Sequence, residues 1–349
     1  MKKTILFLLI FQIIPHSNAA TLRSEIDRYT ILRDRAITDR QLKVESPYQE
    51  FFNLDIVASS GIRTIISDVK SGTETTNSAQ KQLNMFQLLS KYVNSERYVD
   101  VDFTTGFPLF DIKFKKHHFM PSFFFNYNVG LMFTVSNQEN ALNPTGQLYL
   151  KLDKKIGIQT LYPQKKSLYQ FAIYQMTRSD LLSSITSSSL ATSGKLFNLD
   201  DLNKEQKTIA FDIDYMKKNA RDFFQLAAKE VKLLSQTDHK SKYEHKPLLS
   251  ARYGRFLKWE KIMATPFIGI HYRQKYSLHQ GIFIGTKFES LQHPLELTAK
   301  LSNEFITLIP QVKFKYLRFN YTLKNPYRNP QKDVWVSSMH SLNLAIPFP

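Results

Sequence analysis

The sequence predicts an antiparallel transmembrane β-barrel of about 12 strands, with 10 or 14 also compatible because bacterial single-chain barrels have even strand counts. Three observations predict this all-β fold. The N-terminus has the pattern of an export signal, no later segment is apolar for long enough to cross a bilayer as a helix, and alternating strands recur at membrane-spanning length. A soluble β-sandwich is the alternative, because half-buried antiparallel strands also alternate.

The first residues predict a secretory signal peptide covering residues 1–19. Lys2 and Lys3 precede an apolar run over residues 5–14, and Ser17 and Ala19 supply the small side chains that a signal peptidase requires. The apolar run is about half of the roughly 20 residues that a transmembrane helix needs. We therefore expect cleavage near Ala19 and not a membrane anchor.

Composition indicates the kind of partner that the chain binds and excludes several kinds of site. The full sequence has 47 Lys and Arg against 30 Asp and Glu, a formal charge of +17, and loss of Lys2 and Lys3 with the signal peptide leaves +15, which favours anionic partners. For an exported protein these are lipid phosphates or acidic solutes, and we expect no nucleic acid partner. The chain has no cysteine, which excludes a disulfide framework, a thiolate metal site and a cysteine nucleophile. We expect no cofactor.

The longest alternating run covers residues 123–135. Its odd positions are all apolar or aromatic, whereas its even positions are mostly small or polar. The run is longer than the roughly 9 to 11 residues that a tilted transmembrane strand requires. Segments of this kind predict strands at residues 97–104, 107–115, 121–136, 145–162, 167–178, 205–216, 247–258, 262–273, 276–288, 293–301, 304–324 and 333–348.

Some stretches depart from this pattern. Residues 77–93 have helical spacing behind a cap at Asn77 or Ser78, and predict an amphipathic helix that lies either inside the barrel as a plug or at the periplasmic face. Residues 219–235 fit a helix or a strand, and the Ser- and Thr-rich residues 183–193 predict a loop. The alternation changes phase near Tyr316, which indicates a bulge or a tight turn.

The C-terminal segment carries a resemblance. His340, Leu342, Leu344, Ile346 and Phe348 share one phase and end on an aromatic residue, followed by Pro349. This resembles the closing strand of bacterial outer-membrane barrels, whose terminal aromatic is read by the barrel-assembly machinery. Over residues 97–349 the pattern resembles a porin-type or fatty-acid-transporter-type barrel, with residues 20–96 as a periplasmic or plug segment before it. The resemblance implies a location in the outer membrane and contact with its lipids and lipopolysaccharide. The oligomeric state stays open.

The phase opposite to the apolar one should face the barrel interior. It collects side chains of both charges: Asp111, Lys113, Asp212, Asp214, Arg252, Lys287 and Arg318. Such an interior either filters solutes by charge as a wet pore or is closed by structural ion pairs. We expect the chain to be a passive pore or transporter for small solutes, including anionic or amphipathic ones. The alternative is a closed structural or adhesive barrel whose loops contact partners or lipopolysaccharide.

An outer-membrane hydrolase is the third hypothesis, and the sequence offers little for it. His340 and Ser341 are neighbours on a predicted strand, so they point to opposite faces and cannot act as base and nucleophile. His271 and His279 flank a predicted turn, but no serine or acidic partner occupies a matching position. We therefore expect no enzyme, no catalytic residue and no metal site.

Overall fold

The structure is a computed structural model that describes residues 25–43, 50–74, 77–114, 117–136, 144–187, 202, 204–243, 246–329 and 335–347. The predicted signal peptide, Phe348 and most of the predicted loop at residues 183–193 lie outside these ranges. The beginning of that loop is described and differs from the prediction, because residues 183–185 are the end of a strand.

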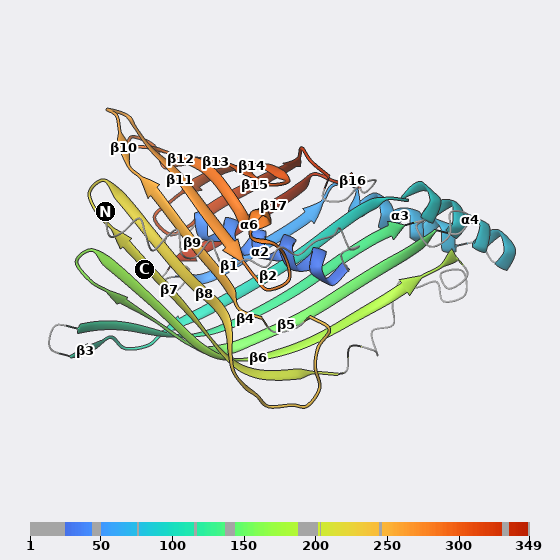
Figure 1. The fold of residues 1–349 in the computed structure, drawn as a ribbon, viewed down its shortest axis with the longest axis horizontal. Helices are drawn as coiled ribbons and strands as arrows, with labels where there is room; N and C mark the ends of the chain where they lie inside the picture. The colour runs from blue at the N-terminus through green and yellow to red at the C-terminus, as the bar shows by residue number, and fades with distance from the viewer. Residues whose placement is uncertain are drawn as a thin grey trace.

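Fourteen long strands form one closed antiparallel barrel (Figure 1). They are β1 (Glu50–Ser59), β2 (Ser95–Pro108), β4 (His117–Ser136), β5 (Thr145–Pro163), β6 (Ser167–Ile185), β7 (Gln206–Lys218), β8 (Asp222–Ser235), β9 (Leu248–Arg255), β11 (Ile262–Tyr272), β12 (Ile282–Ser290), β13 (Leu295–Ser302), β14 (Phe305–Lys313), β15 (Arg318–Pro326) and β17 (Met339–Pro347). The short strands β3 (Ile112–Phe114), β10 (Leu257–Lys258) and β16 (Trp335–Val336) pair beside them.

The barrel closes between its first and last strands. β1 pairs with β2 on one side and with β17 on the other, and Leu54 faces Phe103 and Leu344 in these two ladders. The predicted all-β antiparallel barrel is confirmed, with the strand count at the upper end of the expected range. β17 occupies the closing position that its alternation predicts.

The barrel begins earlier than expected. β1 lies within residues 20–96, which the sequence assigned to a segment before the barrel, so the boundary at residue 97 is wrong. Two helices, α3 (Ile62–Thr73) and α4 (Ser78–Lys91), stand between β1 and β2 in the chain. They separate β1 from the other strands and hide its place in the regular strand sequence.

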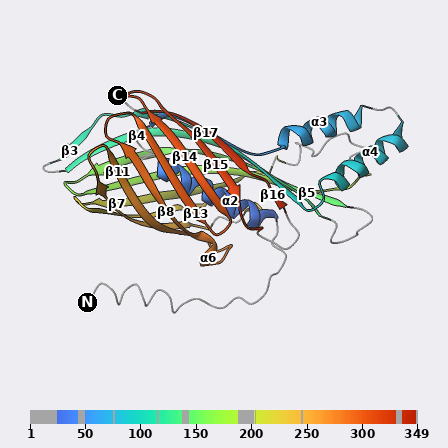
Figure 2. The ribbon, with the colours of Figure 1, turned by 90° about the horizontal axis from the view of Figure 1, so that it is seen from above.

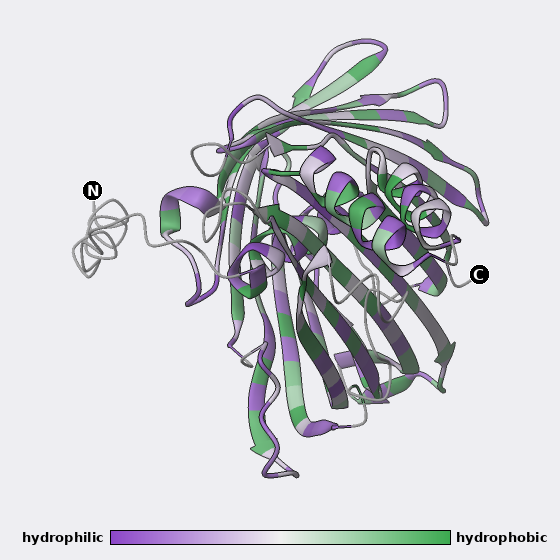
Figure 3. Ribbon diagram, turned by 90° about the vertical axis from the view of Figure 1, so that its right-hand side faces the viewer, coloured by the Kyte–Doolittle hydropathy of each residue, from purple (hydrophilic) through white to green (hydrophobic). Residues whose placement is uncertain are grey.

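The two faces of the wall differ in polarity. Large apolar side chains such as Ile268, Ile284 and Leu308 are exposed on the outside, and the alternate positions turn inward. Figure 3 shows the resulting alternation of hydrophobic and hydrophilic residues along the strands. An apolar exterior with a polar interior is the pattern of a barrel that faces lipid. Within the described residues, none of the helices has the length and apolarity needed to cross a membrane.

The two ends of the barrel carry different connections. At one end, the short-turn end, most hairpins are tight: Gln164 N–H donates to the Ser167 carbonyl, and Asn219 N–H donates to the Asp222 carbonyl. At the other end, the long-loop end, the strands are joined by residues 60–94, 137–144, 186–205, 236–247, 273–281 and 327–338, and by the short turn at residues 303–304.

Helix α2 (Glu25–Lys43) lies inside the barrel (Figure 2). All residues from Arg28 to Ala36 are buried, none more than 4% exposed. Because an α-helix turns once in 3.6 residues, this run is buried around its whole circumference. The sequence pattern of residues 25–43 did not predict this helix.

The predicted helix at residues 77–93 is confirmed as α4, with Asn77 as its cap: the Asn77 side chain accepts from Ala79 N–H and Gln80 N–H. α3 and α4 form a hairpin at the long-loop end and not inside the lumen (Figures 1 and 2).

The structure also decides three other segments. Residues 219–235 are strand β8 for most of their length. Near Tyr316 the chain makes a tight turn, in which Phe314 N–H donates to the Leu317 carbonyl. The predicted strand at 276–288 begins instead with the short helix α6 (Leu278–Gly281).

Candidate functional site: a helix-filled lumen

Ion pairs hold α2 in the lumen from end to end. Near its start, Arg28 lies 2.7 Å from Glu96 and 2.8 Å from Glu304, which belong to the long-loop end. At its last residue, the Lys43 carbonyl accepts from the Gln311 amide of β14 at 3.1 Å. The helix therefore runs from the long-loop end toward the short-turn end, before the chain enters β1.

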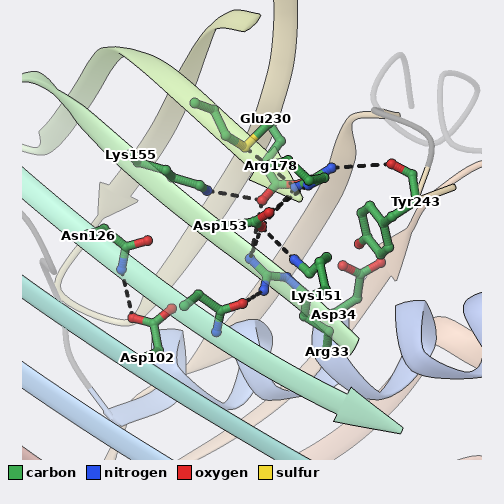
Figure 4. A network of polar contacts seen from close by, with 12 residues as sticks. Arg33, Asp34, Asp102, Asn126, Lys151, Asp153, Lys155, Arg178, Glu230 and Tyr243 are labelled. Carbon is green, nitrogen blue, oxygen red and sulfur yellow. Dashed lines mark hydrogen bonds and ion pairs between the residues drawn. The ribbon is translucent and has the colours of Figure 1, made fainter. Parts of the chain in front are cut away.

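Two buried carboxylates, Asp153 and Glu230, pair with the cations in the middle of the lumen (Figure 4). Asp153 of β5 lies 2.6 Å from Arg178 and 2.5 Å from Lys151, and Arg33 of α2 approaches it to 3.4 Å. Glu230 of β8 lies 3.0 Å from Lys155, and 3.5 Å from Arg33. Arg33 thus joins the helix to two strands of the wall, and a buried charge with several partners is far less costly than an isolated one.

A β-bulge places Glu230 in this network. Glu230 has a φ of 56°, in the left-handed region, and the pairing of β7 with β8 shifts register on either side of it. Its backbone N–H donates to Asp212 at 2.7 Å. The lumen-facing positions of β8 are odd up to Ala227 and become even at Glu230. A bulge reverses the phase of a strand in this way, so it turns the Glu230 carboxylate inward.

The acidic side chains of α2 are matched by cations of the opposite wall. Asp34 accepts from the guanidinium of Arg273 at 2.8 and 2.9 Å and from the Tyr276 hydroxyl at 2.9 Å. Asp39 pairs with Lys300 of β13, and with Lys324 of β15 at 2.6 Å. The cations and the carboxylates of the helix are therefore both paired with opposite charges on the wall.

The turn residue Glu304 gives the helix its clearest pH dependence. Burial would raise the pKa of Glu304, but the charges of Arg28 and Arg35 lower it from an ordinary 4.5 to about 2. A lowered folded-state pKa gives a stabilisation that is complete above pH 4.5 and is lost as the pH falls toward 2.

We expect acidification through this window to loosen the first half of α2, and proteolysis of this segment measured against pH should detect it. Glu304→Gln removes the carboxylate and should make the acid response smaller. Glu205→Gln, at an exposed ion pair with Lys207, is the control and should leave the response unchanged. An identical response in the wild-type protein and in Glu304→Gln would contradict the assignment.

Five of the sequence-predicted lumen residues face the interior. Asp212 accepts from Tyr174 at 2.7 Å, and Asp214 accepts from Gln225 at 3.0 Å. The remaining three have these contacts: Arg252 donates to Gln225 at 2.7 Å, Lys287 lies 2.7 Å from Glu289 and 3.1 Å from Glu296, and Arg318 lies 3.8 Å from Glu50.

Asp111 and Lys113 do not belong to this interior, and their prediction as lumen residues is wrong. Both are exposed on the β3–β4 hairpin, which projects past the short-turn end (Figure 1). Asp111 lies 2.8 Å from the exposed His118. The pairing of β2 with β1 ends at Thr105, so the chain beyond it leaves the barrel wall. The alternation of apolar and charged residues nevertheless continues into the hairpin, and therefore predicts a wall strand there.

A cavity of about 180 Å³ lies between α2 and the wall near the short-turn end. It lies beside Leu42 near the end of α2, and charged and aromatic side chains line it, among them Phe223, Arg252, Phe267 and Lys287. It brings together two of the predicted charged residues, Arg252 and Lys287. Within the part of the chain that the structure describes, no group of three His, Asp or Glu residues has the arrangement of a metal site.

Sequence reasoning missed the larger part of this site, namely α2 and its partners Glu230, Arg273 and Glu304. Charges in residues 25–43 alternate in sign without an apolar stripe, and such a segment also fits a solvated surface. The high density of paired charges was the available signal.

A closed antiparallel barrel with an apolar exterior and a charged interior defines the class of protein: the chain has the fold of an outer-membrane β-barrel. No protein-family model and no curated protein matches the chain. Among solved structures, it is similar to the transport unit of the autotransporter AIDA-I from Escherichia coli, with 8% identity, 94% of this chain and 100% of that chain covered, and a TM-score of 0.41.

Two further solved structures share the barrel architecture at low similarity. CdiB from Acinetobacter baumannii has 8% identity and a TM-score of 0.33, with 84% of this chain and 59% of that chain covered. Wzi from Escherichia coli, an outer membrane protein described as a carbohydrate-binding barrel involved in capsule assembly, has 10% identity and a TM-score of 0.26, with coverage of 94% and 90%.

Proposed function

We propose that this outer-membrane barrel passes small solutes passively when α2 leaves the lumen, and that it is closed while α2 is docked. The observation that carries the proposal is the burial of α2 around its whole circumference from Arg28 to Ala36. Ion pairs hold the helix together with apolar contacts of Tyr29, Ile31 and Leu32, so a change of pH, ligand or potential that acts on the ion pairs can shift its docking equilibrium. The lumen acts in this proposal without a cofactor or a covalent step.

The connections support an orientation in the membrane. Bacterial barrels have short periplasmic turns and longer extracellular loops, so the short-turn end faces the periplasm and the long-loop end faces outward. The α3–α4 hairpin is then extracellular, in contrast to the plug or periplasmic position expected for residues 77–93. The predicted signal peptide would deliver the chain, the assembly machinery would receive β17, and lipids with lipopolysaccharide would surround the rim.

The cavity beside the end of α2 supports a class of solute. Its wall carries three cations, Lys218, Arg252 and Lys287, against one carboxylate, Glu289, which pairs with Lys287, while Phe223 and Phe267 supply apolar surface. The guanidinium of Arg252 lies 5.0 Å from the centre of the Phe223 ring. A small anion with an apolar part fits this lining better than a cation does, which supports transport of the fatty-acid-transporter type over an open porin.

Removal of α2 tests the proposal directly. We expect the intact protein in planar bilayers to be silent for most of the recording, and a chain without residues 25–43 to give discrete current steps because an open lumen is left. Heat-modifiable gel mobility controls for folding of both proteins. Equal currents from the two folded proteins would contradict the proposal.

A closed structural or adhesive barrel is the second candidate, and the exposed α3–α4 hairpin favours it. Asp68 of α3 accepts from Lys91 and Tyr92 at 2.7 Å, so the two helices are joined as one projecting unit. Hydrogen bonds from Lys91 and Tyr92 also lower the pKa of Asp68. A folded α2-deletion variant that stays silent would favour this candidate over the transporter.

A further inference from the structure

Three polar side chains from three separate segments meet on the outside of the barrel near the long-loop end. Ser60 directly follows β1, His340 lies near the start of β17, and Tyr321 lies in β15. Ser60 Oγ is 3.0 Å from His340 Nε2, and the Tyr321 hydroxyl is 2.5 Å from His340 Nδ1. A hydroxyl on one ring nitrogen and a polar group on the other is the arrangement of a nucleophile, its base and the group that orients the base.

This trio faces the lipid side of the wall and not the lumen. Leu342 follows His340 in the same phase and is 50% exposed, and Phe319 precedes Tyr321 in the same phase and is 43% exposed. The three polar side chains themselves are half-buried. The lumen network therefore does not use them, and a substrate that reaches them approaches from the membrane.

The backbone beside Ser60 supplies hydrogen-bond donors. β1 ends at Ser59, Gly61 adopts a φ of 79°, and α3 begins at Ile62, so Ser60 stands on a sharp strand-to-helix turn. Gly61 can adopt this left-handed conformation without strain. The first N–H groups of a helix have no partner within it, and Gly61 has no side chain to cap them. Serine hydrolases place their nucleophile on such a turn, next to N–H groups that stabilise an oxyanion.

A cation stands beside the same turn. A Cβ atom on Gly61 would lie 3.8 Å from Nε and 3.9 Å from Nη2 of Arg97 in β2. Arg97 Nη1 donates to the Glu96 carbonyl, whereas Arg97 Nε is buried and has no hydrogen-bond partner among the described residues. A guanidinium with an unused donor is suited to bind a phosphate group.

We propose that Ser60 and His340 hydrolyse an acyl ester of a phosphate-bearing lipid at the outward rim of the barrel, with Tyr321 as a positioning residue and Arg97 as the phosphate contact. This activity is independent of the lumen and goes beyond the proposed transport function. It departs from the sequence-based expectation that the chain is not an enzyme. Ser60 and His340 are 280 positions apart, so no local motif joins them.

Ester hydrolysis would proceed in two steps, acylation of Ser60 and hydrolysis of the acyl-serine. Ser60 Oγ forms a bond to the ester carbonyl carbon while its proton passes to His340 Nε2, and the helix N–H groups hold the oxyanion. The bond from that carbon to the alcohol oxygen breaks, and His340 returns the proton to the leaving alcohol. Water then attacks the acyl-serine with His340 as base, releasing the fatty acid and restoring Ser60. Nδ1–H donates to Tyr321 Oη throughout, which keeps Nε2 free to accept.

The folded full-length protein in detergent–lipid micelles should release fatty acid from its substrate. Two substrates distinguish the lipid source: a diacyl glycerophospholipid, and lipopolysaccharide with its phosphorylated, acylated anchor. Ser60→Ala and His340→Asn should each lower kcat by about 10³-fold or more. A fluorophosphonate that modifies activated serines should label Ser60, and mass spectrometry should locate the label.

Thr105→Ala is the matched control, because Thr105 is an outward hydroxyl on β2 near the other end of the barrel. It should keep full activity, and heat-modifiable mobility verifies that every variant is folded. Absence of hydrolysis of both lipids by the folded wild-type protein would overturn the proposal. Wild-type activity in Ser60→Ala would overturn it equally.

Two further variants separate catalysis from mere structural contact. Tyr321→Phe should lower kcat and shift its pH profile, because Nδ1 loses its acceptor; a purely structural role would leave the pH profile unchanged. Arg97→Gln should raise KM for the phosphate-bearing lipid with little change for a neutral ester such as p-nitrophenyl butyrate. Equal effects on both substrates would exclude Arg97 as the phosphate contact.

Discussion

Asp34→Ala should lower the free energy of unfolding by about 3–5 kcal/mol, the usual cost of removing one partner from a buried ion pair. Asp34 and Arg273 are both fully buried, and the carboxylate accepts three guanidinium hydrogen bonds as well as one from Tyr276. Without it, the buried guanidinium of Arg273 loses its closest carboxylate and retains Glu230 at 3.1 Å and the Lys246 carbonyl as partners. Urea unfolding of the protein in detergent micelles measures the change.

Asp27→Ala provides the matched comparison on the same helix. Asp27 is partly exposed and lies 3.9 Å from Lys275, so its removal should cost less than about 1 kcal/mol. Replacing both Asp34 and Arg273 by leucine should recover part of the loss, because an apolar pair leaves no buried charge without a partner. Equal losses in Asp34→Ala and Asp27→Ala would show that α2 is not docked in the lumen as described.

Lipid made the outer wall predictable from the sequence. An outward position in contact with lipid must be apolar wherever the strand crosses the membrane, so long runs such as residues 123–135 in β4 show strict alternation. β1 was missed although it alternates, since the α3–α4 hairpin follows it and separates it from the other strands. Asp111 and Lys113 were placed in the lumen because the alternation continues into the β3–β4 hairpin, and alternation alone does not show where a hairpin leaves the wall.

The interior was less predictable because it obeys a different rule. A helix packed on an apolar core along one face shows an apolar stripe, but α2 is surrounded by the wall and mixes buried charges with buried apolar residues such as Tyr29 and Leu32, so it shows none. Its specificity resides in pairs such as Asp34 with Arg273, whose members are 239 positions apart. β8 was undecided between helix and strand because the bulge at Glu230 changes its phase midway. The bulge that obscured the strand is the feature that places Glu230 in the lumen.

The ion pairs of α2 form only when the helix lies at one position in the lumen. A glycine of the wall, Gly130, allows the helix to approach closely enough. Gly130 of β4 faces inward against Tyr29 of α2. A Cβ at Gly130 would lie 1.8 Å from the Tyr29 hydroxyl oxygen and 2.5 Å from its Cζ atom, distances that require the helix or the strand to move. The Tyr29 ring also packs at 5.2 Å from Tyr149 and 5.7 Å from Tyr98, which limits its escape.

Gly130→Val should consequently displace α2 and convert a silent barrel into one that gives current steps, with a loss of about 1–3 kcal/mol from overpacking. Adding Tyr29→Ala to Gly130→Val removes the clash, so the double variant should be more silent and more stable than Gly130→Val alone. Tyr29→Ala by itself controls for loss of the ring. If Gly130→Val matched the wild-type protein in current and stability, Tyr29 would not be docked against β4, and the plug position of α2 would have to be abandoned.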